Sequence, residues 1–408
     1  MTATLTRIRV QTWPGVSDEL LTADPLARES GADYAAAGGY RTVDDLPQRL
    51  AAAGLRGRGG AAFPVAHKLA AVAGRPGPRV VVANGEEGEP ASVKDRYLLL
   101  HRPHLVLDGL RLLAAAAAAD RAIVYVSDDA AESSVTTALS ETTAVWDIPV
   151  SVFRVEHTYV AGEESALVRA IDGGPALPTA KPPRPYEAGV GGAPTLVHNV
   201  ETLAHVALLA GGRGGHTFLA TITGAGRDPA LLELPFGITL GDVVGDVTGL
   251  HGATVGGLFG GLLANPWRIP LAYDDFRALG SGLGCGAFSL IGPGDCPVDA
   301  AADAVGYLAA ESARQCGVCV NATAGLRDVL SRLRTGGATA DDVARMAGWT
   351  RRVPGRGACA LVDAAARMAA TLLDQFPGQV GAHLADPCPV CADLGPLVRH
   401  TRNHLEIS

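Results

Sequence analysis

Cysteine is the residue type with the clearest chemical potential in this chain. All seven cysteines lie in the last third of the 408 residues: Cys285, Cys296, Cys316, Cys319, Cys359, Cys388 and Cys391. Their odd number and uneven distribution do not make a disulfide framework. The N-terminal residues MTATLTRIRVQTWPG contain no basic segment followed by an apolar core, so we expect a location in the reducing cytoplasm. The thiols are therefore interpreted as potential metal or redox ligands.

Two pairs of cysteines have the C-x2-C spacing that lets two thiolates bind one metal centre. They are Cys316 and Cys319 in ESARQCGVCVNATAGL, and Cys388 and Cys391 in DPCPVC. The second pair has two further interpretations: half of a structural zinc site, to which His383 would add only a third ligand, or two inert surface thiols. Cys296, in GPGDCPVDA, is expected at a turn without a functional role.

A glycine-rich segment, GLRGRGGAAFPVAHKL at 54–69, follows an expected helix. It brings three glycines and two cations close together: Gly57, Arg58, Gly59, Gly60 and Lys68. Backbone N–H groups can approach a phosphate closely where no Cβ intervenes, and cations add favourable charge. The segment predicts an anion-binding loop, and the alternative is a flexible turn.

An acidic segment, NGEEGEPASVKDR at 84–96, directly follows the apolar run RVVVAN. Its candidate ligands begin with Asn84, Glu86, Glu87 and Glu89. Open α/β sheets bind ligands beyond the carboxyl ends of their strands, where this segment is expected to lie. The alternative is a solvated surface loop.

The order of helical and strand patterns along the chain predicts three parts: a doubly wound α/β domain, a β-rich module and a helical bundle. Helical patterns at 44–55 and 104–119 alternate with strand candidates at 79–84, 121–127 and 150–155, which predicts a parallel sheet in an α/β domain over 1–210. Short strands at 218–224, 231–237, 238–247 and 253–261 predict a small β module with one short helix over 211–275. Four helical segments between 301 and 376 predict a bundle over 276–408.

The overall charge and hydropathy exclude two classes of protein. A formal net charge of −8, with arginines dispersed among acids, argues against a nucleic-acid-binding protein. The longest apolar run, GLRLLAAAAAAD, is shorter than the roughly 18 residues that a membrane span needs. We therefore expect any membrane contact to be made through partner proteins.

Four segments together resemble the flavoprotein subunit of respiratory complex I, which also occurs in soluble NAD-reducing hydrogenases and formate dehydrogenases. They are GRGGAAFPVAHK, NGEEGEPASVKDR, TYVAGEESALVRAI at 158–171 and KPPRPYEAGVGGAPTLVHNVETLAHV at 181–206. The resemblance covers nearly the whole chain. It implies an FMN-binding Rossmann-like domain, a β-grasp-like module of the SLBB type and a helical bundle that holds a 4Fe-4S cluster.

The resemblance also implies which residues bind the cofactors. FMN would contact the glycine loop, the acidic loop and the two later segments, through Gly57, Arg58, Gly59, Lys68, Asn84, Glu86, Glu87, Gly162, Glu163, Glu164, Val197, His198 and Asn199. NADH would stack on the flavin, where Glu89, Tyr159 and Glu164 are the residues nearest the hydride transfer. The other nicotinamide contacts would be Gly60, Ala61, Phe63 and Lys181.

In that family the cluster is held by three cysteines in a C-x2-C-x2-C run after ES, and by one more about forty residues later. Here Ala313 occupies the first place, Cys316 and Cys319 the next two, and Cys359 the distant one. Three interpretations stay open. A further thiol, such as Cys388, Cys391 or Cys285, completes the site; a cluster with three cysteines keeps an open or water-bound iron; or the cluster is lost and the thiols pack as small hydrophobic groups.

The dinucleotide site departs from the family pattern. Of the family's aromatic residues around adenine only Phe63 is present, because Ala71 and Arg184 occupy the other two places. A guanidinium can stack on adenine and pair with phosphate, so we hypothesise that Arg184 shifts preference toward NADPH, and the alternative is an exposed loop arginine. Ala62 replaces a usual glycine, and His198 replaces an asparagine, which would make the flavin potential sensitive to pH.

We therefore expect a cytoplasmic oxidoreductase subunit that passes hydride from NAD(P)H to FMN and single electrons through a 4Fe-4S cluster. The expected acceptor is a thioredoxin-like 2Fe-2S subunit or a ferredoxin, in a complex that could be attached to the inner face of a membrane. The alternative is a subunit that has lost nicotinamide binding and acts as an FMN and iron-sulfur relay or assembly module. A zinc-stabilised binding protein without flavin is a third interpretation.

Overall fold

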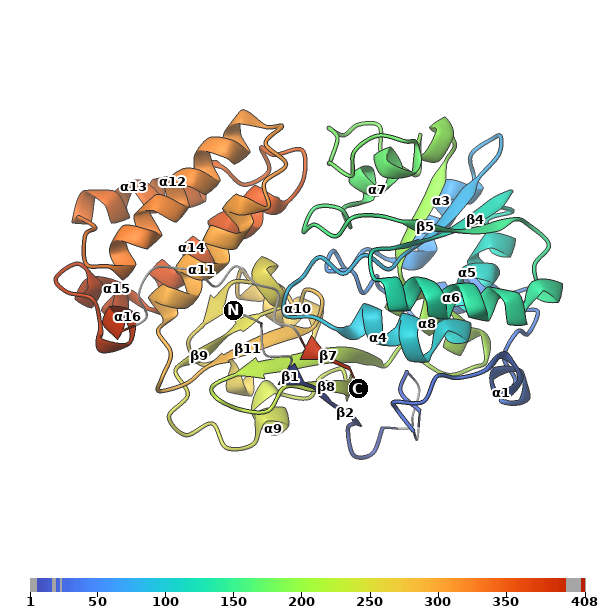
Figure 1. The fold of residues 1–408 in the computed structure, drawn as a ribbon, viewed down its shortest axis with the longest axis horizontal. Coiled ribbons are helices and arrows are strands. Elements are labelled where there is room, and N and C mark those ends of the chain that lie inside the picture. The colour runs from blue at the N-terminus through green and yellow to red at the C-terminus, as the bar shows by residue number, and fades with distance from the viewer. Residues whose placement is uncertain (1–5, 17–19, 23, 394–404, 408) are drawn as a thin grey trace.

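The computed structural model describes residues 6–16, 20–22, 24–393 and 405–407. Figure 1 shows an α/β domain at one end of the long axis, a helical bundle at the other, and a β module between them. The expected order of the three parts is confirmed. The extreme ends of the first and last expected domains, residues 1–5, 394–404 and 408, lie outside the described residues.

The α/β domain contains a four-stranded sheet of parallel strands in the order β5-β4-β3-β6. The strands are β3 (Val80–Asn84), β4 (Arg121–Val126), β5 (Val150–Arg154) and β6 (Thr195–Asn199). Val80 to Ala83 are buried, and their side chains alternate between two hydrophobic clusters. A strand buried on both faces has a continuous apolar sequence, which explains the run RVVVAN.

Helices cover this sheet on both faces. They are α1 (Gly31–Ala36), α2 (Leu46–Ala52), α3 (Val65–Ala73), α4 (Lys94–His101), α5 (Pro103–Ala116), α6 (Asp129–Glu141), α7 (Glu164–Ile171) and α8 (Val200–Ala210), with 3-10 helices η1 (Thr143–Val145) and η2 (Val190–Gly192). Helices α5 and α8 approach each other closely at Gly109, where an added Cβ would lie 1.9 Å from the carbonyl oxygen of Leu203. Only glycine allows this approach.

The β module is a mixed sheet of six strands in the order β10-β9-β11-β7-β8-β2. Its strands are β2 (Arg9–Thr12), β7 (Thr217–Gly224), β8 (Ala230–Pro235), β9 (Gly252–Val255), β10 (Leu262–Leu263) and β11 (Ala287–Ile291). The module therefore extends beyond the expected 211–275 at both ends, because β2 and β11 join the sheet by long-range pairing. Nearby are η3 (Gly257–Phe259), η4 (Pro266–Arg268) and α10 (Tyr273–Ala278).

One expected strand of this module is a helix. The segment 238–247 forms α9 (Leu240–Val244), not a strand. The Thr239 side chain accepts a hydrogen bond from the Asp242 N–H, and the Asp242 carboxylate accepts one from the Thr239 N–H. This capping box satisfies the first N–H groups of the helix and outweighs the β-rich composition of the segment.

The bundle consists of α11 (Pro297–Ala310), α12 (Gly317–Arg334), α13 (Ala340–Arg352), α14 (Leu361–Gln375), α15 (Pro377–His383) and α16 (Pro389–Asp393). All four expected helical segments are helices, although 311–316 is a loop between α11 and α12. Short strands β1 (Thr6–Arg7) and β12 (Leu405–Glu406) pair in parallel and bring the two ends of the chain together.

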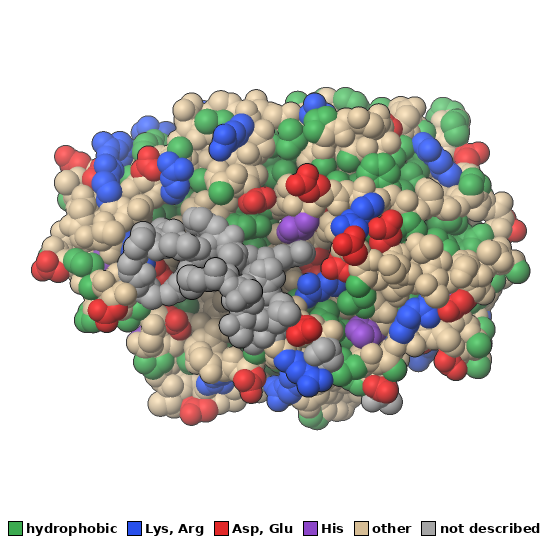
Figure 2. All heavy atoms as spheres, in the orientation of Figure 1, with side chains coloured by type: hydrophobic (Ala, Val, Ile, Leu, Met, Phe, Trp, Pro, Cys, Tyr) green, Lys and Arg blue, Asp and Glu red, His purple; other side chains and the backbone are tan. Residues whose placement is uncertain are grey.

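On the face drawn in Figure 2, Lys and Arg side chains alternate with Asp and Glu side chains. Among the described residues, no helix has the length and apolar character that crossing a membrane requires.

Candidate cofactor sites

The carboxyl ends of β3 and β6 define the first candidate site. The two strands pair in register, so that Asn84 lies opposite Asn199 at the same edge of the sheet. The chain proceeds from β3 to β4 and β5 in one direction, whereas β6 lies on the other side of β3. Such a reversal of strand order opens a crevice between the diverging connections, and it is the usual ligand site of open α/β sheets.

The glycine loop lies at this edge. A Cβ added to Gly59 would lie 3.2 Å from the Cβ of Asn199, so the loop backbone lies directly over the strand end. The Gly57 N–H donates to the Phe63 carbonyl (2.9 Å), which closes the loop. Gly60 has φ +102°, and Ala62 has φ +52°, a left-handed conformation that favours glycine. Phe63 projects outward with 53% of its surface exposed.

A chain of contacts connects the later site residues to this edge. Asn84 Nδ2 donates to the Gly162 carbonyl (2.8 Å), and Lys68 Nζ donates to the Val197 carbonyl (2.9 Å). Lys68 also pairs with Glu164 (3.2 Å), which lies 3.5 Å from Lys181, while Lys181 pairs with Glu163. The structure thus brings together residues from four separate sequence segments.

Charge and burial compete at Glu164. Burial acts to raise the pKa of this carboxyl, but the ammonium groups of Lys68 and Lys181 outweigh it and lower the pKa below its usual value. Glu163 has a different role, because its carboxylate accepts hydrogen bonds from the Ser165 and Ala166 N–H groups and caps α7. Glu164 therefore stays ionised between two lysines at the site.

Two buried polar side chains at this edge lack hydrogen-bond partners among the described residues. Neither carboxylate oxygen of Glu86 has one, although His157 Nδ1 lies 2.7 Å from Oε1. Nε2 of His198 also has none. His157 Nδ1 is therefore the nearest protein partner of Glu86, while Glu86 Oε2 and His198 Nε2 stay available to a ligand or to water at this crevice.

His198 is neutral at physiological pH. Burial and then the nearby charge of Lys68 lower its pKa well below the usual value. A sensitivity of the flavin potential to pH through His198 stays a prediction.

Protein groups beside the glycine loop occupy the Arg58 side chain, and its contribution of charge to the anion site stays a prediction. Its guanidinium donates to Tyr273 Oη (3.0 Å) and to the Thr217 carbonyl (3.2 Å), and it lies 4.7 Å from the centroid of the Phe236 ring. It also lies 3.8 Å from Glu201. These partners belong to α8 and to the β module with its adjoining helix α10, so the Arg58 side chain connects domains. Its guanidinium also donates to the Arg56 carbonyl of the glycine segment (3.2 Å).

Glu87 and Glu89 are also engaged by the protein. Glu87 accepts hydrogen bonds from Ser92 Oγ (2.6 Å), the Asp95 N–H (3.1 Å) and the Arg96 N–H (3.0 Å), which caps the first turn of α4. Glu89 accepts from the Leu258 N–H (2.9 Å) in the β module. Burial raises the pKa of Glu89 to about 7. Glu87 is thus turned toward the start of α4, whereas Glu89 joins two domains.

Asn199 and Tyr159 are held by similar structural contacts. Asn199 Oδ1 accepts from the Glu201 N–H (3.1 Å) and from the buried Lys94 (3.1 Å), while its Nδ2 donates to Asp95 (2.7 Å). The Tyr159 N–H donates to Glu311 of the bundle (2.8 Å). Burial, followed by the charge of Glu89, raises the pKa of the Tyr159 phenol well above its usual value.

The second candidate site lies where the bundle meets the α/β domain. Ala313, Cys316, Cys319 and Cys359 line one pocket, together with Pro178 of the α/β domain. Cys316 Sγ accepts a hydrogen bond from the Ala358 N–H (3.4 Å). Three thiols facing one pocket, with a backbone donor to sulfur, are the ligand chemistry of an iron-sulfur cluster.

Cys388 and Cys391 lie far from this pocket. Cys316 and Cys319 are at the start of α12, whereas the residue before Cys388 packs against Gly336, just after the end of that helix. An 18-residue helix is about 27 Å long. The structure therefore excludes Cys388 and Cys391 as ligands that replace Ala313.

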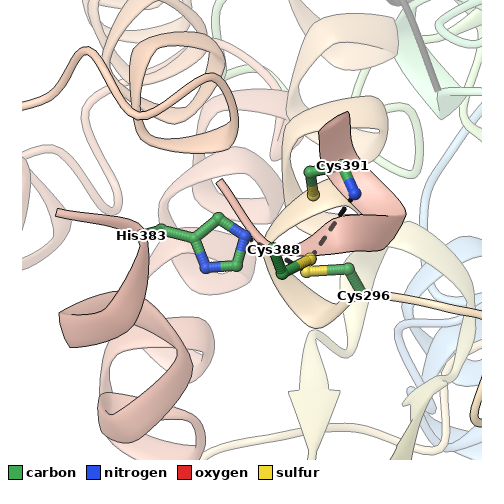
Figure 3. A group of neighbouring side chains, drawn as sticks. All are labelled: Cys296, His383, Cys388 and Cys391. Carbon is green, nitrogen blue, oxygen red and sulfur yellow. Dashed lines mark hydrogen bonds between the residues drawn. The ribbon is translucent and has the colours of Figure 1, made fainter. Parts of the chain in front are cut away.

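The tail cysteines, Cys388 and Cys391, instead lie close to Cys296, for which the sequence predicted no role (Figure 3). The ligand atoms of Cys296, His383, Cys388 and Cys391 all lie within 4.8 Å of one another. Sequence reasoning missed Cys296 because it is 87 positions from His383, and its local motif GPGDCPVDA resembles an ordinary helix start. The sequence signalled only that one cysteine, Cys296, was left without a predicted role.

The two candidate cofactor sites adjoin each other. The charge of Glu163, at the end of the flavin-site network, contributes to raising the pKa of the Cys359 thiol, after burial, which is the main cause. Gln315 beside the cysteine pocket donates to the Pro178 carbonyl (2.6 Å) and accepts from Arg169 of α7 (2.9 Å). One segment of the α/β domain thus borders both sites.

The comparisons with known proteins agree with this geometry. The Nuo51 FMN-binding domain model matches residues 50–208, and the model of the NADH-ubiquinone oxidoreductase-F iron-sulfur binding region matches residues 299–383. An F-type NADH-quinone oxidoreductase subunit of Rhizobium meliloti is 30% identical over 403 residues, which cover 87% of this chain and 95% of the relative.

Further relatives extend the comparison. The mitochondrial NADH dehydrogenase (ubiquinone) flavoprotein 1 of Dictyostelium discoideum is 31% identical, over 83% of this chain and 78% of the relative. A solved structure of an NAD+-reducing NiFe-hydrogenase matches with a TM-score of 0.76 and 29% identity, over 85% of this chain but only 63% of that one. The chain therefore belongs to the family of F-type flavoprotein subunits of NADH-quinone oxidoreductase, and it carries that family's FMN-binding domain and 4Fe-4S binding region.

Proposed function

We propose that this chain is the electron-input subunit of an NAD(P)H dehydrogenase, which receives a hydride at the crevice between β3 and β6 and delivers electrons through the bundle to a partner protein. The observation that carries the proposal is the adjacency of the two sites. Residues 159–181 contact the flavin-site network, Glu311 of the bundle and the cysteine pocket. In this arrangement of the domains, one segment thus connects the site of hydride uptake with the site of one-electron transfer.

The residues at the first site fit FMN. When bound, FMN supplies hydride uptake from a reduced nicotinamide and one-electron delivery, and an iron-sulfur cluster supplies one-electron transfer. The backbone of Gly59 allows close approach to a phosphate, and Lys68 supplies a positive charge, whereas the Gly57 N–H is used to close the loop. Glu86 offers a buried carboxylate that can accept hydrogen bonds from the cofactor.

The residues at the second site fit a cluster with three thiolate ligands, Cys316, Cys319 and Cys359. Ala313 offers no ligand atom, so one metal position has no cysteine from the family pattern. Such a position makes the cluster more exposed to chemical loss than one held by four thiolates. We propose a thioredoxin-like 2Fe-2S subunit or a ferredoxin as the acceptor, and a cytoplasmic location in which partner subunits provide any attachment to a membrane.

Nicotinamide binding is supported by Phe63 and Arg184. The Phe63 ring is exposed and can stack on a base, and Arg184 is exposed on the 181–187 loop. An available guanidinium can pair with the additional phosphate of NADPH. We therefore propose that NADPH is used at least as well as NADH.

An anaerobic titration of the reconstituted protein tests the function. NADH or NADPH is expected to bleach the visible absorption of bound flavin stoichiometrically. Steady-state reduction of ferricyanide then compares kcat/KM for the two nucleotides. The Arg184→Ala variant is expected to lose efficiency selectively with NADPH, and a strong preference of the wild type for NADH would contradict the role of Arg184.

The alternative function is an FMN and iron-sulfur relay without nicotinamide chemistry. The replacement of two family aromatic residues by Ala71 and Arg184 favours it, because each lost stacking contact costs roughly 1 to 3 kcal/mol. Flavin that dithionite bleaches but neither nucleotide bleaches would establish this alternative. Protein that takes up no FMN would refute both functions.

A further inference from the structure

We propose that Cys296, His383, Cys388 and Cys391 form a second metal site, which binds one zinc ion and has a structural role. The four residues come from three parts of the bundle. Cys296 precedes the first residue of α11, His383 is the last residue of α15, and the two tail cysteines lie at the start of and within α16. Figure 3 shows their side chains converging on one point.

The distances fit a single tetrahedral ion. With Zn–S near 2.3 Å and Zn–N near 2.0 Å, two ligand atoms of a tetrahedral zinc lie about 3.5 to 3.8 Å apart. Cys296 Sγ and His383 Nε2 are 3.6 Å apart, and no pair of the four ligand atoms exceeds 4.8 Å. A cubane places each thiolate on a different iron and so holds its ligands farther apart. The group is therefore suited to one ion.

The orientation of His383 supports the site. Its Nδ1 lies 2.8 Å from the Gln379 carbonyl, which can only accept, so the proton is on Nδ1. Nε2 then carries the lone pair, and this atom faces Cys296. A histidine ligand commonly donates its other ring N–H to a backbone carbonyl, which fixes both the tautomer and the direction of the ring.

Burial and backbone geometry indicate a closed site. Cys296, His383 and Cys391 are buried, and Cys388 is half-buried. The Cys391 N–H points at Cys388 Sγ (3.5 Å), as expected for a C-x2-C turn that holds a thiolate. Four protein ligands leave no open position for substrate, and three thiolates with one imidazole are a usual donor set of structural zinc.

The site would attach the tail to the bundle. Helices α15 and α16 are short, with seven and five residues, and have few internal hydrogen bonds of their own. A zinc ion would bind them to the start of the long helix α11. The expected consequence is stability of the bundle, and it requires neither FMN nor an iron-sulfur cluster.

Metal analysis of the purified full-length chain tests the inference. After growth with zinc and iron and treatment with a weak chelator, the wild type is expected to retain one equivalent of zinc in addition to its iron. Cys296→Ser and His383→Gln are expected to lose zinc and keep iron. Cys319→Ser is expected to lose iron and keep zinc. Cys285 neither lines the pocket of Cys316, Cys319 and Cys359 nor belongs to the second group, so it is not the thiol that replaces Ala313, and Cys285→Ser is the control that keeps both metals.

A measurement on the wild type covers the case in which a variant does not fold. Metal-depleted protein titrated with Co2+ is expected to show the visible absorption of tetrahedral cobalt with thiolate ligands. X-ray absorption at the zinc edge is expected to give three sulfur ligands and one nitrogen ligand. Wild type without zinc or cobalt uptake, zinc retained by Cys296→Ser, or iron lost from Cys388→Ser would each overturn the inference, whatever the flavin content.

Discussion

Some residues at the flavin site face the crevice, and others form structural contacts within the protein. Arg58 and Lys68 are both cations of the glycine loop, but Arg58 is buried between the domains and only Lys68 joins the crevice network. Glu86 and Glu87 are adjacent, yet Glu87 caps α4 while Glu86 lacks hydrogen-bond partners among the described residues. Neighbouring residues of the same type thus have different roles.

Substitution of these two glutamates separates cofactor binding from stability. Glu87→Ala is expected to lower the free energy of unfolding of the FMN-free protein by about 2 kcal/mol, because buried donors at the start of α4 lose their acceptor. Glu86→Ala removes only the contact with His157 Nδ1 (2.7 Å), so it is expected to lower this stability less than Glu87→Ala does and to weaken FMN binding at least about tenfold. Urea denaturation and flavin fluorescence titration measure the two effects, and equal loss of FMN affinity in both variants would contradict this division of roles.

Ala313 is the residue at which a fourth cluster thiolate can be restored. Ala313→Cys places a thiol in the pocket that the other three cysteines line, so each iron of a cubane would have its own cysteine. We expect more iron and sulfide per chain, and several-fold slower loss of iron to a chelator.

Ala313→Ser is the matched control for that experiment, because it adds an atom at the same place without a thiol. Its iron retention is expected to stay close to that of the wild type. If the cysteine variant retains iron no better than the serine variant, the pocket does not hold the cluster as we propose.

At the scale of elements, helix α12 decides the arrangement of the metal sites. It begins at the cluster cysteines and ends beside the tail, and its length keeps the two groups of thiols apart. Helices α5 and α8 in the α/β domain are also constrained by their packing, because they meet at Gly109, where no larger side chain fits. Rigid helices therefore set which residues can act together.

The same glycine-to-alanine change is expected to have opposite effects in two helices. Gly109→Ala would place a Cβ 1.9 Å from the Leu203 carbonyl and is expected to cost about 2 kcal/mol or more, because α5 and α8 must separate. Gly348→Ala in α13 meets nothing within 4 Å and is expected to add about 0.5 to 1 kcal/mol by reducing the freedom of the unfolded chain. Urea midpoints compare them, and a neutral Gly109→Ala would show that the helices are loosely packed.

Across the protein as a whole, partly buried polar contacts join the domains. Glu89 accepts the Leu258 N–H of the β module, Arg58 donates to Tyr273, and Glu311 of the bundle accepts the Tyr159 N–H. All three pairs connect residues around the proposed cofactor sites. The domains therefore meet where electrons are expected to pass, and the relative position of the two sites depends on these contacts.

The raised pKa of Glu89 predicts how the stability of the folded chain depends on pH. Its pKa of about 7 in the folded protein lies above the ordinary carboxyl value of 4.5. The native state therefore binds more protons than the unfolded state between these values, and this group's contribution to stability falls as pH rises from about 4.5 to about 7. Glu89→Gln cannot ionise, so its stability relative to the wild type is expected to rise across that interval and stay constant above it.

Urea midpoints of the two proteins at several pH values measure this difference. Ala91 and Leu258 donate backbone N–H groups to both carboxylate oxygens of Glu89, so the amide loses one favourable contact at every pH. This loss changes the free energy of unfolding of Glu89→Gln by the same amount at every pH, so it does not affect how the difference from the wild type depends on pH. A difference that does not change between pH 5 and pH 7 would contradict a raised pKa for Glu89.

Local patterns in the sequence determined the elements and the family. Apolar runs such as RVVVAN, and helical periodicity between 301 and 376, depend on near neighbours, and these segments formed the expected elements except for the loop at 311–316. The prediction of a strand at 238–247 was wrong because a capping box at Thr239 starts a helix there. The long motifs around the glycine and acidic loops identified the cofactors, since their residues are specific and contiguous.

Which of those residues contact a ligand site and which make structural contacts depends on the tertiary structure. Whether Arg58 faces the crevice, and which cysteines meet, depends on contacts between segments far apart in the chain. Cys296 and His383 are 87 positions apart, and no local pattern records that they converge. Ala313 was visible as a missing ligand, but the exclusion of Cys388 and Cys391 as its replacements required the length and direction of α12. The sequence determined the ligand types, and packing determined the ligand sets, because coordination depends on distance in space.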